Sequence, residues 1–126
     1  MNKKQKRIVK QILITKTNAI AIILNNKRYI KVYKNDNLYL FQTHSHTVNA
    51  IDELPNGKII SCSDDKSIHI NSIDNNAIKE KNIKKPFDVI KEAHQLSIQH
   101  LIVISKNRFI SWSNDNKLII RKCELP

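Results

Sequence analysis

A short pattern occurs twice in this chain, and it limits the possible folds more than any other feature. Residues 61–71 read SCSDDKSIHIN, and residues 111–121 read SWSNDNKLIIR. In both, two serines flank one other residue, an acidic turn follows, and apolar alternation comes last. A pattern that recurs with matching surroundings is typical of a fold built from repeated units.

The likeness extends upstream of the pattern. Residues 44–58 (HSHTVNAIDELPNGK) align with residues 94–108 (HQLSIQHLIVISKNR), so that His44 falls on His94. The distance along the chain from the histidine to the end of the pattern is the same in both units, from His44 to Asn71 and from His94 to Arg121. A fainter copy, residues 20–33, aligns with residues 58–71. The sequence therefore predicts three units of similar structure.

The units are predicted to consist of short β-strands. Segments such as YIKVY (29–33) and SIHIN (67–71) alternate with a period of two and are rich in β-branched or aromatic residues. Asn, Asp and the single glycine, which favour tight turns, lie between these segments, and LPNGK (54–58) is a strong hairpin signal. One segment, PFDVIKEAHQL (86–96), also fits a short helix or a loop. We therefore expect an all-β chain.

These units resemble the WD-repeat (WD40) family of β-propellers. Units of that family have about 40 residues and four strands, and they run from a Gly-His pair to a Trp-Asp pair. Residues 29–51 (YIKVYKNDNLYLFQTHSHTVNAI) are similar to the junction between two such units. The chain departs from the family at the tryptophan, whose position is held by Tyr33, Asn71 and Arg121. No unit carries the complete signature.

The resemblance implies a partial propeller over residues 1–126, with about three four-stranded antiparallel blades, the last one incomplete. The expected blades are residues 7–43, 44–83 and 94–123. Their strands are expected near residues 7–15, 19–24, 28–34, 37–43, 47–54, 58–63, 66–72, 77–83, 97–105, 108–113 and 117–122. Propellers close with about four to eight blades, so three leave open edges. We therefore expect the chain to need more blades or to self-associate.

The resemblance also implies a buried polar network in each complete unit. It is formed by His44, Ser61 and Asp65 in the second unit, and by His94, Ser111 and Asp115 in the third. A carboxylate can accept hydrogen bonds from the backbone N–H groups of a tight turn, and a histidine can join it to a hydroxyl of another strand. The role implied for these residues is structural.

The same residue types also occur in two other kinds of site. His, Ser and Asp also form hydrolase triads, but a triad repeated at one spacing argues against catalysis, and the sequence has no G-x-S-x-G motif. His44 and His46 could share a metal ion, but the spacing points to no third ligand. We therefore assign no catalytic residue, metal site or cofactor, and we expect that the chain is not an enzyme.

The expected function is a non-catalytic scaffold for protein–protein interaction, with partners that are other proteins. The alternative is a basic nucleic-acid-binding module, because the net charge is +11 and residues 1–47 carry ten Lys/Arg and one acid, or +9 of it. A hydrolase is less favoured than either. No apolar run reaches the roughly 18 residues that span a bilayer, so we expect no membrane contact. Two cysteines, Cys62 and Cys123, favour a reducing, cytoplasmic location.

Overall fold

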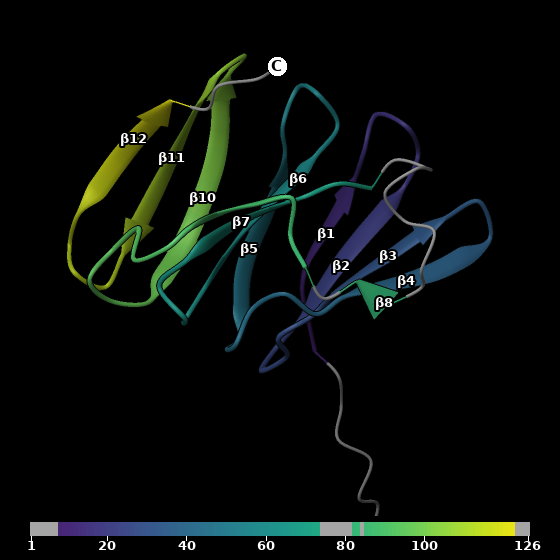
Figure 1. The fold of residues 1–126 in the computed structure, drawn as a ribbon, viewed down its shortest axis with the longest axis horizontal. Coiled ribbons are helices and arrows are strands. Elements are labelled where there is room, and N and C mark those ends of the chain that lie inside the picture. Colours follow the sequence, from purple (N-terminus) through teal and green to yellow (C-terminus); the bar gives the residue numbers. More distant parts are fainter. Residues whose placement is uncertain (1–7, 74–81, 84, 123–126) are drawn as a thin grey trace, which may run out of the picture.

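The computed structural model describes residues 8–73, 82–83 and 85–122, and it contains three β-sheets that lie side by side in an arc (Figure 1). The first sheet contains β1 (Val9–Ile14), β2 (Ile20–Leu24), β3 (Ile30–Lys34) and β4 (Asn37–Phe41). The second contains β5 (Val48–Glu53), β6 (Ile59–Ser63), β7 (Ile68–Asn71) and β9 (Asp88–Ile90). The third contains β10 (Ile98–Ser105), β11 (Arg108–Ser113) and β12 (Leu118–Lys122). The all-β prediction is confirmed, and no helix occurs among the described residues.

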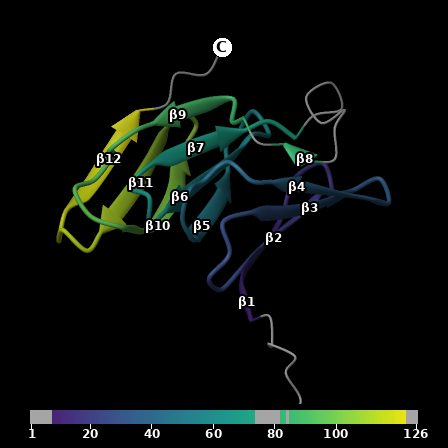
Figure 2. The same ribbon diagram turned by 60° about the horizontal axis from the view of Figure 1, so that its bottom comes forward.

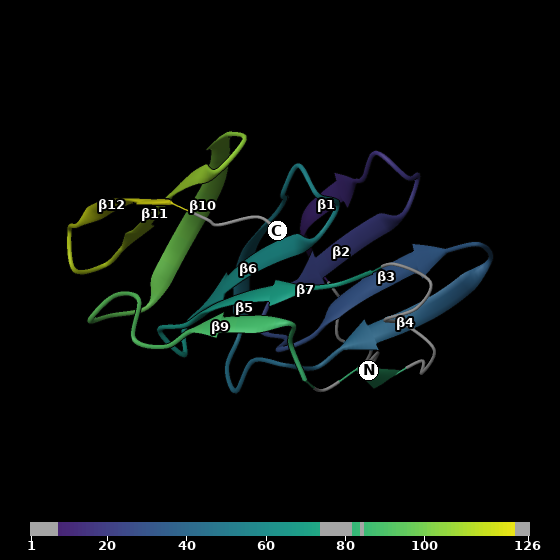
Figure 3. The ribbon, with the colours of Figure 1, turned by 45° about the horizontal axis from the view of Figure 1, so that its top comes forward.

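The fourth strand of the second sheet was predicted in the wrong place. It was expected at residues 77–83, of which 77–81 lie outside the described residues. Asn82–Ile83 form a short strand, β8, but it pairs in parallel with β4 of the first sheet. The fourth strand is β9, which pairs with β7 (Figure 3). The second sheet thus reaches Ile90, beyond the expected boundary at residue 83, and residues 88–90 are a strand rather than a helix or loop.

Tight turns join the strands where the sequence predicts them. Asn35 and Asp36 both have positive φ (52° and 63°) between β3 and β4, a conformation that Asn and Asp tolerate well. Gly57 has φ 90° in the hairpin between β5 and β6. Lys66 and Asn116, with φ 70° and 63°, occupy the same place in the turns after β6 and β11. The last two are the acidic turns of the repeated pattern.

All three sheets share an irregularity in their first strand. A bulge interrupts the pairing of this strand with the second strand of the same sheet. The register shifts between Val9 and Gln11, between Val48 and Ala50, and between Ile98 and His100. The recurrence of the bulge at one place shows that the faint first copy folds like the other two.

The strand pairing corrects the alignment of the faint first copy by one position. The sequence alignment matches Tyr33 with Asn71 and Ile20 with Lys58. In the sheets, Tyr33 pairs with Ile20, whereas Asn71 pairs with Ile59. Ile20 therefore corresponds to Ile59, and one extra residue in the hairpin between β2 and β3 explains the difference.

The second sheet lies between the first and the third (Figure 2). The hydrophobic core forms two layers, one on each face of this sheet. The layer shared with the first sheet includes Ala21, Ile23, Val32, Ile51 and Ile59. The layer shared with the third sheet includes Ile60, Cys62, Ile68, Leu101 and Phe109. Every residue of β6 and β7 is buried, because these strands are covered on both sides. The described residues contain no helix long and apolar enough to cross a membrane.

Side chains also join neighbouring sheets by bonding directly to backbone groups. The Gln11 side chain donates to Ile51 O at 2.7 Å and accepts from Ile51 N at 3.0 Å. Asp52 Oδ2 accepts from Val103 N at 2.7 Å. The first strands of successive sheets are therefore fixed to each other by hydrogen bonds as well as by apolar packing.

Candidate functional site

The structure brings the predicted residues of the second unit into contact. His44 lies in the connection after β4, where its Nε2 contacts Ser61 Oγ at 2.8 Å and its Nδ1 contacts Asp65 Oδ2 at 2.8 Å. Ser61 is fully buried on β6, and Asp65 occupies the turn that follows. The histidine thus joins a strand to a turn, and both of its ring nitrogens are used.

The Asp65 carboxylate holds the turn between β6 and β7. Its Oδ2 accepts from Ser45 N at 3.1 Å, and its Oδ1 accepts from Ser67 N at 2.9 Å. The Ser67 hydroxyl donates to the same Oδ1 and also contacts His44 Nδ1 at 3.3 Å. These bonds satisfy backbone groups that a tight turn would otherwise leave without partners.

The third unit repeats this arrangement at the equivalent positions. His94 Nε2 contacts Ser111 Oγ at 2.9 Å, and His94 Nδ1 contacts Asp115 Oδ2 at 3.1 Å. The Asp115 carboxylate accepts from Gln95 N at 3.2 Å and from Lys117 N at 2.9 Å. The contacts of the six predicted residues are therefore present in both units, and their contribution to stability remains a prediction.

A second repeated pair of serines was aligned in the sequence but not assigned to the network. Ser63 Oγ donates to His46 O at 3.1 Å and accepts from Asp65 N at 3.0 Å. Ser113 Oγ makes the equivalent bonds, to Leu96 O at 3.1 Å and from Asp115 N at 3.2 Å. The recurrence of both serines in the pattern is the signal that could have identified them.

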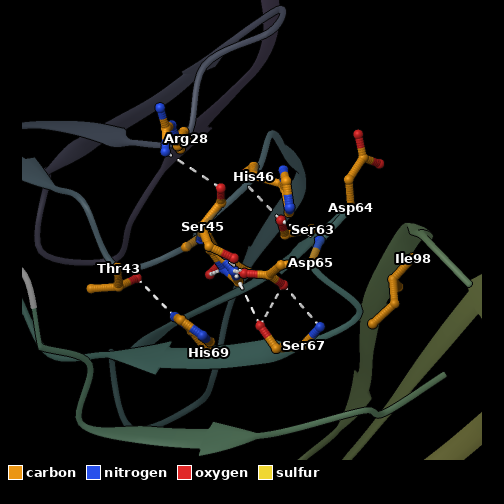
Figure 4. A network of polar contacts seen from close by, with 12 residues as sticks. Arg28, Thr43, Ser45, His46, Ser63, Asp64, Asp65, Ser67, His69 and Ile98 are labelled. Atoms are coloured by element: carbon orange, nitrogen blue, oxygen red, sulfur yellow. Dashed lines mark hydrogen bonds and ion pairs between the residues drawn. The ribbon is translucent and has the colours of Figure 1, made fainter. Parts of the chain in front are cut away.

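One buried histidine of the site was not predicted. His69 lies on β7, and its ring stacks on that of His44 with centroids 3.7 Å apart. Its Nδ1 contacts Thr43 Oγ1 at 2.8 Å (Figure 4). The third unit carries Ile119 at the equivalent position, since His69 pairs with Ser61 and Ile119 pairs with Ser111. Comparison of the units could not reveal a residue that only one of them contains.

The network lowers the pKa of its carboxyl groups. Burial alone would raise the pKa of Asp65, but the hydrogen bond and charge of His44 and the hydrogen bonds from Ser67 outweigh it and hold this pKa well below its usual range. The pKa of Asp115 is also lowered, because the hydrogen bonds from Lys117, His94 and Gln95 outweigh desolvation. Both carboxylates therefore accept hydrogen bonds in their charged form at neutral pH.

Protonation of His69 is expected to weaken the fold between pH 6.5 and pH 4. Burial, together with the charge of His44, lowers the pKa of His69 from 6.5 to about 4. The unfolded chain therefore binds more protons in this range, so the stability is complete above pH 6.5 and falls as the pH falls. We expect His69 to account for a loss of about 1–2 kcal/mol between pH 7 and pH 5.

Urea unfolding at both pH values, at one protein concentration, measures this loss. His69→Phe keeps a ring beside His44 but cannot be protonated, so it should remove the His69 part of the pH dependence. His46→Phe, at an exposed histidine, is the matched control and should retain it. An identical pH dependence in the two variants would contradict the assignment.

The cluster around His44 also brings potential metal ligands together. One potential ligand atom from each of His44, Asp65 and His69 lies within 4.8 Å of the others. His46, which the sequence analysis considered together with His44, is not part of this group. Hydrogen bonds already engage both nitrogens of His44 and Nδ1 of His69. Hydrogen bonding thus accounts for the cluster, and the absence of a metal stays a prediction.

The nucleophilic side chains of the network and of the adjoining core are enclosed by the fold. Ser61, Ser111 and Cys62 are each 0% exposed, and burial raises the pKa of the Cys62 thiol. A substrate could not approach these atoms without disruption of the core. The geometry is suited to holding turns against strands.

Comparisons with known proteins identify the fold. No protein-family model and no curated protein sequence matches the chain, but solved structures do. The structure of the WD40 β-propeller domain of Doa1 matches with a TM-score of 0.68 and 23% identity, over 94% of this chain and 38% of that chain. This chain has a WD40-like fold.

Two structures of Polycomb repressive complex 2 from Chaetomium thermophilum also match the WD40-like chain. A humanized mutant bound to the inhibitor GSK126 matches with a TM-score of 0.73 over 89% of this chain and 27% of that chain, and a second structure with 0.71 over 89% and 26%. Both are 13% identical to this chain. The WD40-like chain thus spans less than two fifths of each of these matched chains, and its three sheets correspond to blades of a propeller.

The residues at the WD40 tryptophan positions differ in burial and in hydrogen bonding among the three blades. Tyr33 is 41% exposed on the outer side of the first sheet. Asn71 is buried, and its Nδ2 contacts Ser61 Oγ at 3.4 Å. Arg121 donates to Ala93 O, and burial lowers its pKa. Asn71 Oδ1 and Arg121 Nε are buried and have no hydrogen-bond partner among the described residues.

A polar cleft of about 470 Å³ opens beside the network of the WD40-like chain. It lies between the hairpin joining β2 and β3 and the connection that carries His44. Arg28 from this hairpin donates to Ser45 O at 3.5 Å, which places it beside the cluster (Figure 4). The residues that line the cleft are Asn26, Lys27, Arg28, Tyr29, Gln42 and His44.

Proposed function

We propose that this chain is a non-catalytic scaffold that binds other proteins. The observation that carries the proposal is the enclosure of both His–Ser–Asp clusters, which use their polar atoms to fix turns inside a WD40-like fold. A scaffold needs a rigid body with variable loops at its surface, and the network supplies that rigidity. The matched chains from a multiprotein complex are consistent with protein partners.

The polar cleft is a part of the surface that can receive a partner. It contains two basic residues, Lys27 and Arg28, and no acidic residue among those that line it. Tyr29 and Gln42 add groups that can donate and accept hydrogen bonds. We infer that the cleft receives an acidic segment of the partner protein, because complementary charge favours encounter and fixes register.

The two alternative functions gain no support from these observations. The buried serines give no support to a hydrolase, and the comparisons give none to the nucleic-acid-binding alternative. Most of the basic N-terminal run, residues 1–7, lies outside the described residues. Lys10 is described, and its Nζ contacts Asn49 Oδ1 at 2.8 Å. A cytoplasmic location remains part of the proposal.

Charge reversal in the cleft tests the proposed function. The chain is used to capture partners from nuclease-treated extract of its own cells, and cross-linking mass spectrometry maps the contacts. We expect cross-links from an acidic partner segment to the neighbourhood of Lys27. Arg28→Glu should weaken capture about tenfold or more, which corresponds to about 1.4 kcal/mol.

Lys106→Glu is the matched control, because this lysine is exposed in the hairpin between β10 and β11. It should leave partner capture unchanged. Equal losses in the two variants would show that net charge rather than the cleft determines binding. Capture that disappears after nuclease treatment would favour the nucleic-acid alternative instead.

A further inference from the structure

Both ends of the arc present apolar sheet faces to solvent. The outward side of the third sheet, here the C-terminal face, has Ile102, Leu118 and Ile120 exposed by 48%, 61% and 60%. It consists of His100, Ile102, Ile110, Trp112, Leu118 and Ile120. The outward side of the first sheet, here the N-terminal face, has Ile12 and Ile14 exposed by 57% and 69%. It consists of Ile12, Ile14, Ile20, Ile22, Lys31, Tyr33, Leu38 and Leu40.

The C-terminal face repeats a face that is already packed inside the chain. Cys62 of the second sheet pairs with Ala50 and Ile68, and Trp112 of the third pairs with His100 and Leu118, so these positions correspond in the repeat. The second-sheet positions pack against Leu101 and Phe109 of the third sheet. The C-terminal face is therefore the side of a blade that covers the next blade.

The N-terminal face repeats the opposite side. Ile12 pairs with Ile22 as Ile51 pairs with Ser61, and Ile20 pairs with Tyr33 as Ile59 pairs with Asn71. In the second sheet, Ile51 and Ile59 pack against the first sheet. The N-terminal face is thus the side of a blade that receives the preceding blade.

We propose that a second copy of this chain covers these faces, with the C-terminal face of each copy on the N-terminal face of the other. This contact is of the same kind as the two sheet–sheet interfaces inside each chain. Two copies with three sheets each supply six sheets. A ring of six lies within the range of about four to eight in which propellers close. Closure also covers both exposed faces at once, which an open stack cannot do.

Charge predicts how salt acts on the assembly. The N-terminal face carries Lys31, and the C-terminal face is bordered by the cross-strand pair Arg108 and Lys122. Both faces thus include or border positive groups, and each copy has a net charge of +11. Screening should strengthen the dimer as salt rises.

Light scattering on the 126-residue chain, at tens of micromolar and two salt concentrations, gives the first test. The expected mass is twice 14.7 kDa, reached more completely at the higher salt and constant on further concentration. A monomer at both salt concentrations would overturn the proposal and assign the faces to another protein or to further blades. A mass that keeps growing would overturn the closed ring.

Complementary variants test which faces meet. Ile14→Lys and Ile120→Lys each alter one face and should each abolish the dimer. Their equimolar mixture should recover a species of two chains, because each variant retains the face that the other has lost. Asn114→Lys adds the same charge at an exposed turn position and should leave the dimer intact. Failure of the mixture, with both variants folded by circular dichroism, would overturn the pairing.

Trp112 provides a readout that does not depend on a change in the third sheet. It is the only tryptophan of the chain, so its fluorescence reports the C-terminal face alone. We expect its emission to shift to shorter wavelength as protein concentration rises, and Ile14→Lys, at the other end of the arc, to remove that shift. A shift that persists in Ile14→Lys would show that the N-terminal face does not cover Trp112.

Discussion

Phe109→Ala is expected to lower the free energy of unfolding by about 3–5 kcal/mol, because it removes a large side chain from a packed layer. Phe109 is 1% exposed on β11, and it is the largest residue of the layer between the second and third sheets. Its neighbours Leu101 and Ile60 belong to strands that are paired and packed within this layer, so they cannot move far to fill the space. The cavity term therefore adds to the lost transfer free energy.

Urea unfolding at a fixed protein concentration measures this loss, since assembly would otherwise shift the midpoint. Phe87→Ala is the matched control, because the same atoms are removed from a side chain that is 62% exposed. The Phe87 ring is contacted by Lys58 Nζ at 4.4 Å from its centroid, and loss of such an exposed contact costs about 1 kcal/mol or less. Similar losses at the two positions would contradict the packing described here.

Asp65→Ala is expected to lower the free energy of unfolding by about 1–3 kcal/mol. The carboxylate accepts bonds from two backbone N–H groups, from the Ser67 hydroxyl and from His44. Alanine leaves these groups without an acceptor in a site where the His44 side chain is 1% exposed. Most of the loss comes from the buried polar groups that remain, rather than from the bond itself.

Two further variants show whether the loss in Asp65→Ala comes from this network. Asp64→Ala, one residue earlier, removes an exposed carboxylate that accepts from the Asn49 side chain, and it should change stability little. Asp115→Ala should destabilise the third sheet in the same direction but less, because the third unit has Lys117 in place of the Ser67 hydroxyl. An effect of Asp64→Ala equal to that of Asp65→Ala would show that the turn needs charge rather than this network.

Most of the fold could be predicted because two signals agreed. Alternation with a period of two located the strands, and the repeated pattern gave the order and the equivalent positions of the strands. The strands expected near residues 58–63 and 108–113, for example, are β6 and β11 with almost the same bounds. The network followed from the family resemblance, and its six residues make the expected contacts.

The unpredicted parts depend on tertiary contacts or occur in one unit only. β9 has three residues, too few for alternation to show, and it is defined by its pairing with β7. β8 has two residues and pairs with β4, a strand of the preceding blade. His69 and Ser67 have no counterparts in the third unit, so a comparison of units could not find them. Such residues become visible only when the strands are placed in space.

The buried middle sheet has a consequence for the order in which the molecule opens. In a linear array of units, each terminal unit can detach at the cost of one interface, whereas the central unit has two. Since β6 and β7 are buried along their whole lengths, their amide protons can exchange with solvent only after a neighbour has detached. Local opening of a single chain therefore begins at the two ends of the arc and reaches the second sheet last, so that this sheet is the slowest part of the chain to open.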